Sequence, residues 1–232
     1  MPFASSRMLL AGLALVLAWR NPVNDTFTRI LLLVGLAGIW LGILEYLWKH
    51  RVCRWAWLAL PLGLAALLLM PGQSPVKEIQ MNYVAQLAKY EGSPYCWGGE
   101  SPLGIDCSGL PRRALREAML IEGLRHADGA ILRKALVHWW IDASARDLGT
   151  GKRNLTIPLG IECTIAEADT AALQPGDLAV TLGGVYVMVF LGDDHWIQAD
   201  PSQGQVVIEH GKKDPNPWFD NPVTLHRWRL ES

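Results

Sequence analysis

Residues 95–110 read YCWGGESPLGIDCSGL, and this stretch indicates how the rest of the chain is arranged. A turn-rich loop leads to Cys107, and apolar residues then recur at helical spacing from Leu110 to Met119. Cys107 is therefore predicted at or just before a helix N-terminus. The unpaired backbone N–H groups and the dipole at such an end lower a thiol pKa and favour the nucleophilic thiolate. The position indicates a nucleophile, while the alternative is a buried, unreactive cysteine.

The pattern Tyr-x-Trp-Gly-Gly, followed by Asp-Cys-Ser-Gly-Leu, resembles the NlpC-type cell-wall peptidases, which are papain-like cysteine endopeptidases that cut peptidoglycan stem peptides. A second block, residues 175–199, contains Pro-Gly-Asp-Leu, an apolar run ending in Leu-Gly, and Trp-Ile-Gln-Ala. The resemblance covers residues 76–229. Within them, several apolar runs typical of strands follow clustered helical segments, which predicts an α+β domain with helices packed on a mostly antiparallel sheet.

The resemblance also implies the residues of a site. Cys107 takes the position of the nucleophile. Tyr95 matches a tyrosine whose hydroxyl lies near that cysteine, and a core aromatic is the equal alternative for it. Asp106 and Ser108 are expected to help bind the peptide, and the favoured bond follows D-glutamate. No cofactor is expected, since the sequence has neither a CxxC nor a His-x-x-x-His pattern of metal ligands.

The pattern departs from the family at the general base. Tyr186 occupies the position of the catalytic histidine and is expected to face a polar cleft, while Gln198 occupies the orienting position, where an amide can hold a ring N–H. A phenol has a pKa near 10, against about 6.5 for imidazole, so Tyr186 is a poor base at neutral pH. His195 has the opposite strand parity to Gln198 and is expected on the other face. The other candidates approach only through tertiary contacts: His138, His210 and His226.

Three functions fit this pattern. The leading prediction is a membrane-anchored cysteine endopeptidase that hydrolyses peptidoglycan stem peptides and is impaired because Tyr186 replaces the histidine. The second is a non-enzymatic wall-binding module that keeps the groove without turnover. The third is a papain-like amidase or acyltransferase. The formal net charge of −1 gives no sign of a nucleic-acid surface, and the oligomeric state stays open.

Residues 1–70 are expected to form a membrane anchor because three apolar stretches fall within them. The predicted spans are residues 3–19, 30–48 and 55–70. A bilayer span needs about 20 apolar residues, which the second stretch meets most clearly and the first only marginally. A cleaved signal peptide is the alternative for the first stretch, but no convincing small-x-small cleavage site precedes Arg20.

The loop of residues 49–54 carries three permanent positive charges and no acid, which predicts that it lies in the cytoplasm. The third span then leads outward, through a linker at residues 71–75, to a domain at residues 76–232 with a helical insertion at about residues 122–150. This domain is expected on the outer side of a bacterial cytoplasmic membrane, with peptidoglycan peptides and the lipid bilayer as partners. Two cysteines could pair in that compartment: Cys96 and Cys163.

Overall fold

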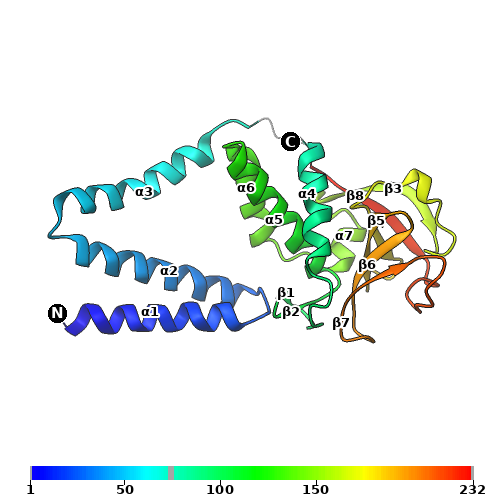
Figure 1. Cartoon of the computed structure of the whole chain (residues 1–232), viewed down its shortest axis with the longest axis horizontal. Helices are drawn as coiled ribbons and strands as arrows, with labels where there is room; N and C mark the ends of the chain where they lie inside the picture. Colours follow the sequence, from blue (N-terminus) through cyan, green and yellow to red (C-terminus); the bar gives the residue numbers. More distant parts are fainter. Residues whose placement is uncertain (1, 73–75, 231–232) are drawn as a thin grey trace.

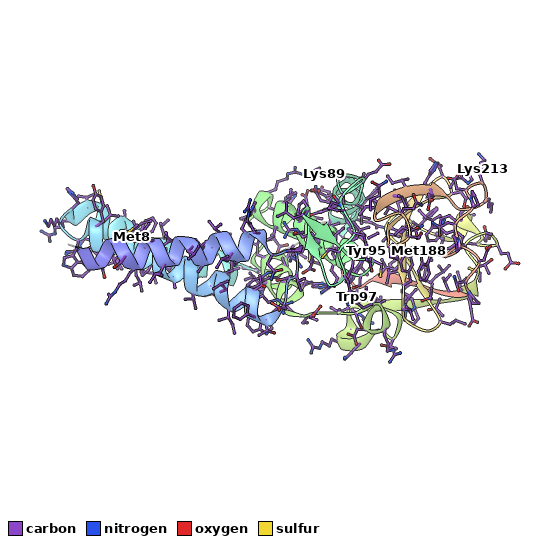
Figure 2. The ribbon with its side chains drawn as sticks, turned by 90° about the horizontal axis from the view of Figure 1, so that it is seen from below. Met8, Lys89, Tyr95, Trp97, Met188 and Lys213 are labelled. Carbon is purple, nitrogen blue, oxygen red and sulfur yellow. The ribbon has the colours of Figure 1, made fainter. Side chains whose placement is uncertain are left out.

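The computed structural model describes residues 2–72 and 76–230, so part of the predicted linker lies outside the described residues. Three N-terminal helices form an arm that leads away from an α+β domain (Figure 1). Figure 2 shows the arm from below, with Met8 toward its far end and Trp97 in the domain. The helices of the arm are α1 (Pro2–Arg20), α2 (Thr26–Leu47) and α3 (Arg51–Leu69).

Two helices among the described residues, α2 and α3, are long and apolar enough to cross a membrane. They correspond to the second and third predicted spans and begin about one helical turn earlier than predicted. Their apolar side chains face outward: Leu33 and Leu41 on α2 and Leu60 on α3 are 45%, 53% and 56% exposed. The domain therefore does not cover these helices as it would cover the core helices of a soluble protein.

The first helix packs against the second through small residues. A Cβ atom added at Gly35 would lie 2.8 Å from the Leu15 side chain, and one added at Gly38 would lie 2.7 Å from that of Ala11. Glycines at such positions let two helix backbones approach closely, which is a common way for helices to associate within a bilayer. The first two helices thus form a hairpin, and its turn lies at the domain end of the arm (Figure 1).

The domain packs four helices on one face of a six-stranded sheet in which every neighbouring pair of strands is antiparallel, with the order β3-β8-β4-β5-β6-β7. The predicted α+β class is therefore confirmed. The helices are α4 (Val76–Ala88), α5 (Gly109–Arg125), α6 (Gly129–Trp140) and α7 (Ala145–Gly149). The strands of the sheet are β3 (Thr156–Cys163), β4 (Leu178–Thr181), β5 (Val187–Gly192), β6 (His195–Asp200), β7 (Gln205–His210) and β8 (Val223–Trp228). Three short elements complete the domain: a two-stranded sheet of β1 (Glu100–Ser101) and β2 (Gly104–Ile105), and the 3-10 turns Lys152–Asn154 and Thr170–Ala172.

Each face of the sheet has its own core. On the helix side, Leu115 and Met119 of α5 are fully buried in the same cluster as Ile197 of β6. On the other side, Met188 and Phe190 of β5 share a cluster with residues of the irregular segments that cover this face. Alternation along a strand sends successive side chains to opposite faces, so position 186 shares its face with Met188 and not with the helices.

Candidate active site

Asp106 organises the start of α5. Its Oδ1 accepts hydrogen bonds from the backbone N–H groups of Ser108 and Gly109, at 3.0 and 2.5 Å, and from the Ser108 hydroxyl at 3.0 Å. Its Oδ2 accepts from the Gly98 N–H at 2.9 Å, which joins the glycine turn to the helix. Cys107 therefore lies just before a helix N-terminus, as predicted, but a carboxylate already occupies the N–H groups of that terminus.

The Cys107 thiol is buried. The residue is 6% exposed, and its Sγ donates to the carbonyl oxygen of Val185 at 3.9 Å. Burial raises the pKa of Cys107 to about 12, the charge of Asp106 adds to the rise, and backbone N–H groups of Val187 and Ser108 offset only part of it. The prediction of a lowered pKa is wrong for this structure, because desolvation of the thiolate outweighs the field of a helix end that Asp106 largely neutralises.

Tyr186 lies immediately before β5 and is 2% exposed. Its ring stacks on that of Trp218, with centroids 3.9 Å apart and planes at 5°, and its hydroxyl donates to the carbonyl oxygen of Ala199 at 2.9 Å. Burial, followed by the charges of Asp200 and Cys107, raises the pKa of Tyr186 well above its usual value. The expectation that position 186 faces a polar cleft is wrong, because the ring lies in a largely apolar cluster, which also contains Cys107.

Gln198 is fully buried on β6, and its amide nitrogen donates to Glu209 Oε2 at 2.8 Å. Its Oε1 accepts from no donor among the described residues. Buried amide oxygens in folded proteins normally accept a hydrogen bond. The role predicted for Gln198, to hold the N–H of an imidazole at position 186, stays a prediction, because the present Tyr186 hydroxyl bonds to Ala199 instead.

Sequence reasoning missed a polar network beside Gln198. The amide nitrogen of Asn216 donates to Asp200 Oδ2 at 3.0 Å and to Glu209 Oε2 at 2.7 Å. Asp200 and Asn216 are 0% and 4% exposed, so these bonds lie in the interior, where such groups need partners. The available signal was the alternation of polar with apolar residues along β6, which places Gln198 and Asp200 on one face.

Tyr95 is half-buried in the loop that precedes β1, and its ring packs against the helix-side core. Burial, together with the charges of Cys107 and Asp106, raises the pKa of Tyr95 to about 12. Those charges act on the phenol because it lies near the cysteine. The side chain thus contributes to the core and also borders the site, so its predicted role at the site stays a prediction.

A cleft of about 490 Å³ opens beside Cys107. Trp97, which is 77% exposed, and Gly98 line one wall, and residues 183–185 line another. Arg112 contributes to its lining, while no histidine is among the residues that form it. The cleft can therefore admit an extended peptide next to the thiol, but the imidazole that a papain-like mechanism requires is absent from its walls.

The turn between α1 and α2 supplies a further wall of this cleft. Val23 and Asn24 line it, Val23 pairs with Gly99 as an antiparallel bridge, and the Glu100 N–H donates to the Pro22 carbonyl oxygen at 2.8 Å. The Asn24 amide also bonds to the Glu100 carboxylate. The arm is thus joined to the site by backbone pairing as well as by the chain connection.

Glu100 connects that turn to α5. Its buried carboxylate lies 2.8 Å from the Arg116 guanidinium and 3.7 Å from that of Arg112. Burial alone would raise the pKa of Glu100, but the two guanidiniums hold it below its usual range. The sequence carried a signal for this ion cluster. Arg112 and Arg116 lie four residues apart on a helix that is mostly buried, and buried guanidiniums need a carboxylate partner.

The histidines of the chain lie elsewhere. His195 is exposed, and its ring lies 5.3 Å from that of His210. His138 is buried against Trp228 on the helix side, with ring centroids 5.9 Å apart. His226 Nε2 lies 2.9 Å from the Thr224 hydroxyl on β8. The four cysteines are all free, so the pairing considered for two of them is not formed.

One group of possible metal ligands occurs among the described residues, at Glu78, Glu122 and His126. The Glu122 carboxylate already accepts from Arg125 at 3.0 Å and from Asn82 at 2.7 Å. The group joins α4 to the end of α5 and is separate from the cleft. The hydrogen bonds of Arg125 and Asn82 to Glu122 explain the arrangement of these side chains without a bound ion.

The fold and site define a papain-like α+β domain with a cysteine at the start of the helix that packs on the sheet. The sequence profile of the NlpC/P60 family matches residues 92–219, more than half of the chain, and the chain belongs to that family. The resemblance on which the sequence analysis relied is therefore confirmed.

Individual relatives match smaller parts. Dipeptidyl-peptidase 6 of Lysinibacillus sphaericus is 46% identical over 50 residues, which are 18% of each protein. Protein P54 of Enterococcus faecium is 29% identical over 130 residues, covering 53% of this chain and 18% of that protein. Among solved structures, the peptidoglycan hydrolase RipB of Mycobacterium tuberculosis shares 23% identity over 64% of this chain and 65% of that one, with a TM-score of 0.40. The chain thus spans less than a fifth of the length of either curated relative.

Proposed function

We propose that this chain is a membrane-anchored NlpC/P60 domain that acts on peptidoglycan stem peptides, with Cys107 as its nucleophile and with hydrolysis impaired in the chain as it stands. The family match supports the substrate class, and RipB is one relative described as a peptidoglycan hydrolase. The observation that carries the impairment is the hydrogen bond from the Tyr186 hydroxyl to Ala199, which leaves the thiol without a base.

In this mechanism the Cys107 sulfur attacks the carbonyl carbon of the peptide bond and expels the amine. The attack needs a thiolate, and the leaving amine needs a proton. Burial keeps the thiol protonated at neutral pH, and Tyr186 neither takes that proton nor forms a cation that stabilises the thiolate. Acylation is therefore slow, although the cleft beside the sulfur remains open to a peptide.

The remaining site residues have two proposed roles, which are to position Cys107 and to contact the peptide. Asp106 uses both carboxylate oxygens to hold the loop and the helix, so its role in this proposal is to position Cys107. Ser108 and Tyr95 border the site and are proposed to contact the peptide. The bond after D-glutamate remains the favoured target by family resemblance.

A non-enzymatic binding module is the second candidate, because the raised pKa of Cys107 suits retention of a peptide better than its cleavage. An amidase or acyltransferase differs from both in the mass of its product. Digestion of purified peptidoglycan by the full-length chain, analysed by mass spectrometry, separates the three. A binding module would sediment with the peptidoglycan and release nothing.

The matched variants are Cys107→Ala and Cys96→Ala, since Cys96 is a half-buried thiol on the same loop. Slow release of stem peptides that is lost in Cys107→Ala and kept in Cys96→Ala supports the peptidase. Release that survives in Cys107→Ala excludes that residue as the nucleophile. Sedimentation without release in any of the three chains favours the binding module.

The same proposal divides the chain into an anchor at residues 1–70 and a domain at residues 76–232, whose helical insertion at about residues 122–150 includes α6 and α7. The basic loop of residues 49–54 lies at the far end of the arm from the domain (Figure 1), which supports a cytoplasmic loop and an external domain. A reporter fused after Ser232 should be active only outside the cytoplasm and one near Arg51 only inside. Cytoplasmic activity of the first fusion would remove the domain from its substrate.

A further inference from the structure

Helix α6 connects the two places where the arm meets the domain. In its second turn, the Arg133 guanidinium donates to the carbonyl oxygen of Leu68, at the end of α3. At its last residue, the carbonyl oxygen of Trp140 accepts from Arg29 Nη1 of α2 at 2.6 Å. One end of α6 is therefore held at the C-terminal end of α3 and the other near the N-terminal end of α2.

This placement sets the direction of the helix relative to the arm. The 12 residues of α6 extend about 18 Å. Figure 1 shows the helix on the side of the domain that faces the arm, where it runs from the C-terminal end of α3 toward the N-terminal end of α2. Those two ends are where α2 and α3 would leave a bilayer. A helix that joins them runs along the bilayer surface.

The outward side of α6 is apolar. Leu136, Val137 and Trp140 are 47%, 52% and 52% exposed, and with Arg133 they follow the i, i+3, i+4, i+7 spacing of a single stripe. The opposite side is buried in the domain and contains Ile131, Leu132 and Ala135. The outer stripe of a helix in water is normally polar, so large apolar side chains here indicate an apolar or interfacial neighbour.

We propose that the stripe of Leu136, Val137 and Trp140 rests in the interfacial layer of the lipid bilayer, as the apolar face of an amphipathic helix does. The inference depends on the proposed membrane anchoring. The bilayer is the occupant because both ends of the helix are held at the domain-side ends of α2 and α3. Tryptophan is also enriched at the headgroup level of membranes.

The contact would fix the orientation of the domain. With α6 on the surface and the α1–α2 turn bonded to Gly99 and Glu100, the cleft beside Cys107 is held at a constant distance from the bilayer. Stem peptides close to the membrane would then be reached in preference to those deeper in the wall. The stripe thus contributes to the choice of substrate without contacting it.

Photochemical labelling of the full-length chain in phospholipid vesicles tests this proposal. Benzoylphenylalanine introduced at Val137 should attach phospholipid on irradiation, seen as a mass increase of one lipid per chain. The matched control is Met81 of α4, an apolar residue 59% exposed on a helix of the same domain, where lipid attachment should be at least tenfold lower. The membrane control is Leu60 within α3, which should attach lipid readily.

The outcomes separate this inference from the anchoring on which it depends. Lipid attached at Leu60 and Val137 but not at Met81 supports the surface contact. Lipid at Leu60 alone overturns the contact and leaves the anchoring intact, and so does attachment of Val137 to a second copy of the chain or to another protein. No lipid at Leu60 overturns the anchoring and this inference with it.

Discussion

The hydroxyl of Tyr186 donates to the carbonyl oxygen of Ala199 at 2.9 Å, while the ring stacks on Trp218. The hydrogen bond and the stack hold the side chain in a position where the hydroxyl proton is directed at a backbone carbonyl. Gln198, next to Ala199 on β6, keeps a buried Oε1 that accepts from no described donor. Position 186 thus holds a phenol where the family has an imidazole, and the orienting role of Gln198 stays a prediction.

Replacing Tyr186 by histidine should increase peptide cleavage by about 10²- to 10⁴-fold, the usual contribution of general base catalysis. An imidazole can take the thiol proton and donate its other N–H to Gln198. The substitution should lower stability by about 1–3 kcal/mol, because it weakens the stack on Trp218 and removes the bond to Ala199. Rates of stem-peptide release and thermal unfolding of the same samples measure the two effects.

Tyr186→Phe is the matched control, since it keeps the aromatic stack and removes only the hydroxyl. It should cleave no faster than the unmodified chain. A folded Tyr186→His variant that also shows no increase would mean that the cleft only binds, or that another group already serves as the base. Loss of residual activity in Cys107→Ala would distinguish the second case from the first.

Alkylation of Cys107 should be slow at pH 7 and should accelerate about tenfold per pH unit up to about pH 11. With a pKa of about 12, only about one thiol in 10⁵ is ionised at pH 7, and the thiolate is the reactive form. Peptide mapping after iodoacetamide treatment gives the rate for each cysteine separately. In the denatured chain the Cys107 rate should level off near pH 9, and a similar plateau in the folded chain would show that burial does not control this thiol.

The backbone around Cys107 could be predicted from the sequence, whereas the pKa of its thiol could not. The loop, the helix that begins after Cys107 and the antiparallel sheet follow from local patterns of glycine, apolar spacing and alternation, so they were predicted correctly. The pKa of Cys107 depends on desolvation by distant segments, which no local pattern reports. Likewise, Asn24 bonds to Glu100 across 76 residues of sequence, so the contribution of the arm to the cleft appears only in the folded chain.

Glu100→Gln should destabilise the protein by about 3–5 kcal/mol, because it removes the buried charge that pairs with Arg116 and that, together with Asp142, compensates Arg112. It should also weaken the attachment of the α1–α2 turn, which bonds to the same carboxylate through Asn24. Thermal unfolding in detergent measures the first effect, and faster hydrogen exchange of residues 21–24 reports the second.

The matched control for that change is Glu117→Gln on α5. Glu117 lies 2.7 Å from Arg113, but both side chains are partly exposed, at 26% and 34%. The amide oxygen of glutamine can still accept from the Tyr90 hydroxyl, so loss of the charge should cost no more than about 1 kcal/mol and should leave exchange at the turn unchanged. Equal destabilisation by the two substitutions would contradict the role assigned to Glu100.

His138→Phe should make the protein less sensitive to acid. Burial, reinforced by the charges of Lys134 and Arg116, lowers the pKa of His138 to about 4, whereas an unfolded histidine titrates near 6.5. The stability that depends on its neutral form is therefore present above pH 6.5 and is lost as the pH falls from 6.5 toward 4, by about 2 kcal/mol at pH 5. Phenylalanine keeps a ring against Trp228 and does not titrate, so the unfolding midpoint of the variant should fall less between pH 7.5 and pH 5. Some acid sensitivity should remain, because burial also lowers the pKa of His226. Equal losses in the variant and the unmodified chain would show that His138 is not the group whose protonation destabilises the fold.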